Sequence, residues 1–205
     1  MNEGSGTTVY DRSGYDNHGV IFGATWQKIW RDWILSFDGT DDYVGIGKPL
    51  LNNLKEFTLA GWIFPRASGS RIGFFGQNDA IEFGFINSTT IQCWTSGGGS
   101  VNWSFTPDTF PMNEWHFVAV VGNGASSPYL ALYIDGARVA TGGKATENFG
   151  SSPYPFNIGG GGVFDASGNW LNGLIGEVLV FRKALSAEQI SFLYNLFRGE
   201  LRKPP

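Results

Sequence analysis

The residues with the clearest chemical potential are the acids of a short polar segment between two apolar runs. Asp38, Asp41 and Asp42 follow one another closely, with Gly39 among them. Asp and Gly suit a tight turn, because Gly tolerates positive φ and an Asp side chain bonds its own local backbone. Three carboxylates this close repel one another unless water, a basic side chain or a cation offsets them. A calcium ion is one such cation, because it takes about six to eight hard oxygen ligands.

Tryptophans near polar loops form a second candidate site, for carbohydrate binding. Sugars offer CH faces that stack on aromatic rings and hydroxyls that suit Asn, Asp and Gln. The chain has 8 Trp and is 16% aromatic, so burial in the core is the alternative for each ring. We expect the ligand-binding residues among the tryptophans Trp94, Trp103 and Trp170 and the polar residues Asn78, Asp79, Asn102, Asp165 and Asn169.

Catalysis is the alternative class of function to ligand binding, and the sequence supports it only weakly. Glycoside hydrolysis uses two carboxylates, about 5 Å apart in retaining enzymes and further apart in inverting ones. Asp79 and Glu82 come nearest to this pattern, but residues at this spacing point to opposite faces of a strand. His18 and His116 have no nucleophile motif beside them, His116 is expected to be structural, and Cys93 to be a buried small hydrophobe. We expect no enzymatic activity and no catalytic residue.

The composition indicates one large β domain. The 205 residues include 30 Gly, and only 16% are charged, against about 25% in an ordinary domain. Many glycines and aromatics with few charges are typical of a multi-stranded sandwich with tight turns. The formal net charge is −4 and no basic patch is visible, so nucleic acid is not an expected partner.

The sequence shows no targeting segment and no membrane segment. It is polar from the start, unlike a signal peptide, and no apolar run approaches the roughly 20 residues that span a bilayer. The single cysteine, Cys93, excludes an intramolecular disulfide and leaves the compartment open. We expect a soluble chain without membrane insertion.

Apolar patterns predict about a dozen short strands and one final helix. Residues 57–64 and 115–121 are apolar on both faces, as in strands covered from both sides. Ser186 and Gln189 match a capping box ahead of an amphipathic helix. The other predicted strands are 20–22, 34–37, 71–76, 80–86, 89–95, 101–105, 130–134, 138–140, 156–159 and 174–181, while 26–33 fits either a loop or a strand pair.

The domain boundary is expected near the end of this helix. Gly199 can end it, and Lys203-Pro204-Pro205 has the character of a linker. We therefore expect one domain over residues 1–198 and a linker or tail over 199–205.

Several short motifs occur in order: FDG at 37–39, DYV at 42–44, FTLAGWI at 57–63, WHFVA at 115–119, LYIDG at 132–136 and GLIGEV at 173–178. In this order they resemble the laminin G-like jelly-roll domains of the concanavalin A-like lectin/glucanase superfamily, over about residues 2–197. The resemblance implies an all-β, two-sheet antiparallel jelly-roll sandwich with one short C-terminal helix. In the family a Trp-containing strand leads into the segment similar to Asn2-Glu3-Gly4, so we expect a domain cut from a longer protein or a divergent start.

The resemblance also implies a structural or ligand-bridging calcium ion, which the family often holds through acidic loops. The positions that match its acidic motifs are Asp11, Asp38, Asp42 and Glu177, whereas Asp41 is expected to face water. The alternative is that Asp11 and Asp38 cap turns and that Glu177 pairs with Arg or backbone amides. The spacing does not match a dedicated calcium loop.

From the resemblance we expect a non-catalytic recognition module that binds carbohydrate, in a secreted or surface-exposed protein. The alternative is a structural or adhesion module that contacts protein in a larger viral or cell-envelope assembly. A glycoside hydrolase is the third class. The fold does not choose among them, because lectins, hydrolases and adhesins share it.

Overall fold

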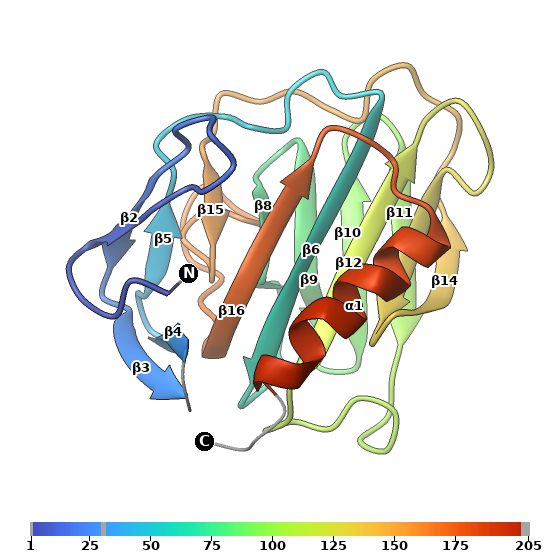
Figure 1. Ribbon diagram of the computed structural model, residues 1–205. Coiled ribbons are helices and arrows are strands. Elements are labelled where there is room, and N and C mark those ends of the chain that lie inside the picture. Colours follow the sequence, from blue (N-terminus) through green and yellow to red (C-terminus); the bar gives the residue numbers. More distant parts are fainter. Residues whose placement is uncertain (1, 30–31, 202–205) are drawn as a thin grey trace.

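The computed structural model describes residues 2–29 and 32–201, without the side chains of 197–201. Two antiparallel sheets stack on one another, and a helix lies across the outer face of one of them (Figure 1). The expected all-β sandwich with a C-terminal helix is confirmed. Within the described residues, no helix is long and apolar enough to cross a membrane.

Among the described residues, the first sheet has nine strands, and its pairings are antiparallel. In spatial order the strands are β1 (Thr8–Val9), β2 (Gly19–Phe22), β5 (Tyr43–Gly45), β15 (Phe156–Ile158), β8 (Phe75–Gln77), β9 (Ile81–Asn87), β10 (Thr90–Thr95) and β11 (Gly99–Ser104), with β7 (Ile72–Gly73) paired to β9.

The second sheet has seven strands in the part of the chain that the structure describes, and it carries the helix α1 (Ala187–Leu201) on its outer face. The segment 26–33 belongs to a strand pair in this sheet, with residues 30–31 outside the described part. In spatial order the strands are β14 (Ala137–Gly142), β13 (Leu130–Ile134), β12 (His116–Asn123), β6 (Glu56–Pro65), β16 (Asn172–Phe181), β4 (Asp32–Asp38) and β3 (Thr25–Ile29).

Strand β6 is apolar on both faces because both faces are covered. Phe57 and Leu59 point into the core between the sheets, whereas Trp62 and Phe64 point outward under α1. Trp62 stacks on Tyr194 of the helix, with ring centroids 5.6 Å apart. The helix begins where the capping box predicts: Gln189 donates its backbone N–H to Ser186 Oγ at 3.3 Å. Burial of rings on both sides of one strand fixes its position in the sandwich.

Strands β9 and β10 alternate between core and surface, and this alternation positions the candidate site. Phe83 and Cys93 point into the core, while Glu82 and Trp94 point to the outer face. Glu82 and Trp94 are directly paired across the two strands, so their side chains lie next to each other.

Three glycines let a long loop settle on this outer face. A Cβ on Gly73 would lie 2.5 Å from Val163, and one on Gly84 would lie 2.9 Å from the Phe164 ring and 2.1 Å from the Ile72 carbonyl oxygen. Gly76 is similarly close to Val163, at 3.3 Å. Without side chains at these positions, the loop 159–171 packs directly on the sheet and forms one wall of a cleft.

Two local predictions are wrong. The predicted strand 71–76 is two strands, β7 and β8, interrupted at Phe74, and Arg71 lies outside both with a φ of 54°. Helix α1 runs to Leu201, past its predicted end at Gly199, because glycine ends a helix only when it leaves helical backbone angles. The predicted tail 199–205 therefore begins inside the helix, and residues 202–205 lie outside the described part.

His116 and Cys93 are structural, as predicted. The imidazole is buried, with Nδ1 3.1 Å from Asp135 Oδ2 and Nε2 2.9 Å from the Pro111 carbonyl oxygen. It stacks on Phe110 with ring centroids 3.8 Å apart. Burial raises the pKa of the Cys93 thiol, so this side chain packs as a hydrophobe.

Candidate functional site

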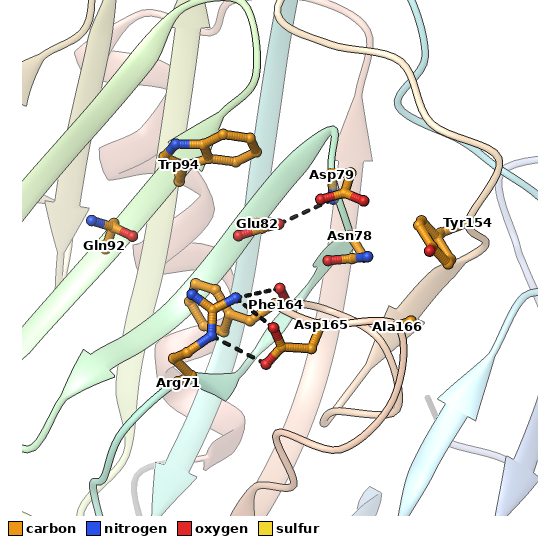
Figure 2. Close-up of a pocket in the computed structure, with 10 residues that line it drawn as sticks. All are labelled: Arg71, Asn78, Asp79, Glu82, Gln92, Trp94, Tyr154, Phe164, Asp165 and Ala166. Atoms are coloured by element: carbon orange, nitrogen blue, oxygen red, sulfur yellow. Dashed lines mark hydrogen bonds and ion pairs between the residues drawn. The ribbon is translucent and has the colours of Figure 1, made fainter.

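A cleft of about 390 Å³ opens on the outer face of the nine-stranded sheet. Its floor is formed by β9 and β10, and the loop 159–171 forms one wall. In Figure 2, Trp94 and Gln92 stand on one side, and Asn78 and Tyr154 on the other. The lining residues are Arg71, Asn78, Asp79, Glu82, Gln92, Trp94, Tyr154, Phe164, Asp165 and Ala166.

Arg71 and Asp165 join the floor of the cleft to its wall. Nε of Arg71 donates to Asp165 Oδ2 at 3.1 Å and Nη2 donates to Oδ1 at 2.8 Å, a two-pronged ion pair. Nη2 also donates to the Phe164 carbonyl oxygen, and the guanidinium carbon lies 5.3 Å from the centre of the Phe164 ring. The hydrogen bonds from Arg71 hold the pKa of Asp165 below its ordinary value.

Asn169 also holds Asp165 in place, through two hydrogen bonds. Its Nδ2 donates to Asp165 Oδ2 at 2.9 Å, and its Oδ1 accepts the Asp165 backbone N–H at 2.9 Å. Asn169 has a φ of 65°, a conformation that Asn tolerates better than most residues. Two loop residues therefore hold the ion pair: the Phe164 carbonyl accepts from Arg71, and Asn169 donates to Asp165.

Asp79 and Glu82 face the same cleft, which corrects the prediction that they point to opposite faces of a strand. Asp79 lies in a turn before β9, with a φ of 59°, so strand alternation does not apply to it. Its backbone N–H is donated to Glu82 Oε1 at 3.0 Å. Glu82 is only 5% exposed, and burial raises the pKa of its carboxyl to about 7.

The side-chain amide of Asn78 faces the cleft. The residue is 4% exposed, and its backbone is fixed, since its N–H donates to the Gly162 carbonyl oxygen and its own carbonyl oxygen accepts from Ser152 Oγ. Within the described part of the chain, its side-chain amide has no hydrogen-bond partner. The amide atoms of Asn78 are not among the solvent-shielded polar atoms that lack a partner, so they reach the cleft and can pair with an occupant.

Trp94 and Gln92 complete the floor from β10. Both side chains are half-buried, and the indole stands beside the buried carboxyl of Glu82 (Figure 2). Gln92 Nε2 donates to Asn102 Oδ1 on β11 at 2.7 Å, so Asn102 orients a lining residue from outside the cleft. The cleft thus combines one aromatic surface with fixed donors and acceptors.

The structure brings together part of the predicted ligand-binding set. Four predicted residues line the cleft: Trp94, Asn78, Asp79 and Asp165. Asn102 and Asn169 lie one hydrogen bond behind it.

Trp103 and Trp170 do not line the cleft. Trp103 pairs with the buried Ile91 and packs against Phe105 and Phe110. Trp170 lies beside Tyr43, with ring centroids 5.8 Å apart.

The predicted ligand-binding set missed six of the ten lining residues. The alternation of Glu82 with Phe83 predicted that Glu82 lies on one face of a strand, but no feature of the sequence indicated that this face borders a cleft. No local signal identifies Arg71, Tyr154 or Phe164, because their role depends on contacts between distant segments.

The predicted metal residues are only partly brought together. Asp38 and Asp42 lie with Asp41 in a group whose carboxylate oxygens are within 4.8 Å of one another. Asp42 is buried, and burial raises the pKa of its carboxyl. Asp11 instead accepts hydrogen bonds within its own loop, and Glu177 lies on β16; neither belongs to this group.

The comparison with protein families gives one match. Residues 38–191 match the family model Laminin_G_3, described as the concanavalin A-like lectin/glucanases superfamily. No curated protein matches the chain.

Solved structures with the same fold include binding domains of toxins. The binding domain of Paraclostridial Mosquitocidal Protein 1 is 14% identical, with a TM-score of 0.67 over 94% of this chain and 50% of its own. The binding domain of botulinum neurotoxin DC, solved in complex with SialylT, is 19% identical, with a TM-score of 0.65 over 95% of this chain and 50% of its own. The chain thus spans about half the length of these toxin domains.

A third structure matches along most of both chains. It is domain 4 of AbnA, an extracellular arabinanase from Geobacillus stearothermophilus, in complex with arabinotriose. It is 15% identical, with a TM-score of 0.57 over 84% of this chain and 82% of its own.

Proposed function

Because the chain belongs to the concanavalin A-like lectin/glucanase superfamily, we propose that it is a non-catalytic module that binds carbohydrate in the cleft of the nine-stranded sheet. The observation that carries this proposal is the side-chain amide of Asn78, which makes no hydrogen bond within the described residues and faces the cleft together with the Trp94 ring. A sugar matches both groups, since its hydroxyls pair with an amide and its CH face stacks on an indole.

The structural neighbours support binding rather than turnover. Those compared above are a mosquitocidal toxin binding domain, a neurotoxin binding domain in complex with SialylT, and an arabinanase domain in complex with arabinotriose. By the same comparison, we propose that the chain acts outside the cell as one module of a longer protein.

The test is a glycan array probed with the purified chain, followed by titration calorimetry on the best ligand. We expect Trp94→Ala to weaken binding about tenfold, because an aromatic contact contributes up to about 1.5 kcal/mol beyond its buried area. Trp103→Ala is the matched control: Trp103 is also half-buried on a neighbouring strand, but packs toward the core. Melting curves verify that both variants fold.

The outcomes test the position of the binding site and the binding of carbohydrate separately. Equal loss of binding in the two variants would place the ligand elsewhere. An array without any bound glycan would reject carbohydrate binding altogether.

A second candidate function is contact with a protein surface. It is favoured by a group of exposed side chains around β2, where Phe22 is 44% exposed and stacks on Tyr43 with ring centroids 4.5 Å apart. Val20 on the same strand is 48% exposed, and Tyr10, whose ring contacts His18 just before β2, is 54% exposed. Self-association by light scattering that is lost on Phe22→Ser, together with an empty array, would support this function instead.

A further inference from the structure

We propose that Asp165 determines the specificity of the cleft: by holding the guanidinium of Arg71, it restricts the cleft to neutral glycans and excludes glycans that carry a carboxylate. This inference rests on the proposed carbohydrate binding. It concerns which class of sugar is accepted, and it makes one residue responsible for the choice.

Arg71 is the only cationic residue that lines the described cleft, and its charge is already engaged. Two of its nitrogens donate to Asp165, at 3.1 and 2.8 Å, and Nη2 also donates to the Phe164 carbonyl oxygen. The Phe164 ring covers the guanidinium at 5.3 Å. A sugar carboxylate would have to break this two-pronged pair to gain a cation, and such pairs are the stronger class of hydrogen bond.

The remaining ionisable groups of the cleft are mainly acidic. Asp79 and Glu82 line it together with Asp165, three carboxyl groups against one guanidinium. A carboxylate ligand would therefore meet like charge, which disfavours its binding. A neutral sugar avoids this cost, because its hydroxyls can donate to the carboxyl groups and accept from the amides of Asn78 and Gln92.

The loop keeps the pair in place. Asn169 donates to the same oxygen, Asp165 Oδ2, that accepts from Arg71 Nε. Asp165 is thus held from two directions, and Arg71 is itself fixed in a left-handed conformation with a φ of 54°. The Arg71 and Asp165 side chains are partly exposed, at 40% and 53%, but the guanidinium already donates to Asp165 and to the Phe164 carbonyl, so a ligand carboxylate would have to displace these contacts.

The test changes the charge of Asp165 and keeps its shape. In Asp165→Asn, the donor of Asn169 favours the orientation with the amide oxygen at the Oδ2 position. The amide nitrogen then faces Arg71 Nη2, and two donors cannot pair. Arg71 keeps its hydrogen bonds to the oxygen at the Oδ2 position and to the Phe164 carbonyl. It loses the counter-charge and the second hydrogen bond to residue 165, so its positive charge becomes available to a ligand carboxylate.

The assay compares matched sugars. Each neutral oligosaccharide on the array is printed beside an analogue that carries a uronic or sialic acid, and affinities are measured by calorimetry. For the unmodified chain we expect the acidic member to bind at least about tenfold more weakly than the neutral one. Asp165→Asn should tighten binding of the acidic member about tenfold, a change of about 1.4 kcal/mol.

Two controls separate release of the Arg71 charge from a general change in charge. Asp79→Asn removes the same charge from the cleft and leaves the Arg71–Asp165 pair intact, so it should alter acidic binding less than threefold. The double variant Arg71→Gln with Asp165→Asn should lose the gain. The single variant Arg71→Gln should weaken acidic binding less than threefold, since it too changes only the net charge of the cleft, and this holds even if Asp165→Asn does not fold.

Equal or tighter binding of acidic members by the unmodified chain would overturn the inference while leaving carbohydrate binding in place. So would a folded Asp165→Asn without the gain, an equal gain in Asp79→Asn, or a loss of acidic binding greater than threefold in Arg71→Gln. If the unmodified chain binds no member of any pair, the proposed function fails, and the inference fails with it.

Discussion

Replacement of Glu82 by glutamine should remove a pH-dependent loss of stability. Glu82 is 5% exposed at the floor of the cleft, and burial raises the pKa of its carboxyl from 4.5 to about 7. The folded protein therefore holds this proton over a pH range in which the unfolded chain has released it. Between about pH 4.5 and 7 the folded state binds more protons, so its stability falls as the pH rises.

The size of the effect follows from the shift. A change from 4.5 to about 7 corresponds to roughly 3 kcal/mol at about 1.4 kcal/mol per unit. Solvent in the open cleft screens the charge, which reduces the expected effect to roughly 1–2 kcal/mol. Glutamine has the same shape and no charge, and its carbonyl oxygen can still accept the Asp79 N–H. The variant should therefore gain about 1–2 kcal/mol over the unmodified chain between pH 5 and pH 8.

The assay is urea unfolding of both proteins at pH 5 and at pH 8. The informative quantity is the difference in free energy of unfolding between the two proteins, compared at the two pH values, because any constant effect of the substitution cancels. In thermal melts, about 1 kcal/mol corresponds to about 2–4 °C for a domain of this size. Glu114→Gln is the control, since Glu114 is exposed and the same change there should show no such pH dependence.

Two results would refute the reasoning about Glu82. One is a difference between variant and unmodified chain that is the same at both pH values. The other is a larger advantage of Glu82→Gln at pH 5 than at pH 8, which would mean that the folded protein stabilises the ionised carboxylate.

Two further predictions concern the acidic turn and the helix. Calcium binding at Asp38, Asp41 and Asp42, if it occurs, should make a chelator lower the melting temperature by several degrees, and equal melting with and without the chelator would reject a metal role. Ser186→Ala should lower the free energy of unfolding by about 1 kcal/mol, because the hydroxyl accepts the Gln189 N–H. We expect the melting temperature to fall by about 2–4 °C. An unchanged melting temperature would mean that packing alone holds the start of the helix.

Local patterns in the sequence were enough to predict the sandwich. Residues 57–64 and 115–121 are apolar on both faces, and the structure covers them with the core on one side and the helix on the other. Asp135-Gly136 forms the turn between β13 and β14, with φ values of 49° and 80°. Ser186 and Gln189 cap the helix as their spacing predicts. These features depend on neighbours within a few residues, which a sequence displays directly.

The cleft was decided by tertiary structure. Arg71 and Asp165 are separated by 94 residues and meet only because the loop 159–171 packs on a glycine floor. Trp94 and Trp103 look alike in the sequence, but the register of β10 with β11 turns Trp103 toward the core and leaves Trp94 facing outward. The acids Asp79 and Glu82 share one face because a left-handed turn breaks the alternation of the strand.

The chain by itself thus determined which segments become strands, where the helix begins and that the core is aromatic, because each depends on local spacing of apolar and turn-forming residues. Only the folded structure decided which polar groups converge. Loop packing and strand register set those contacts, and both depend on segments that are far apart in the sequence. The acidic turn that stands out in the sequence remains a prediction for calcium, whereas the most developed site lies around residues that the sequence left inconspicuous, Arg71 and Glu82.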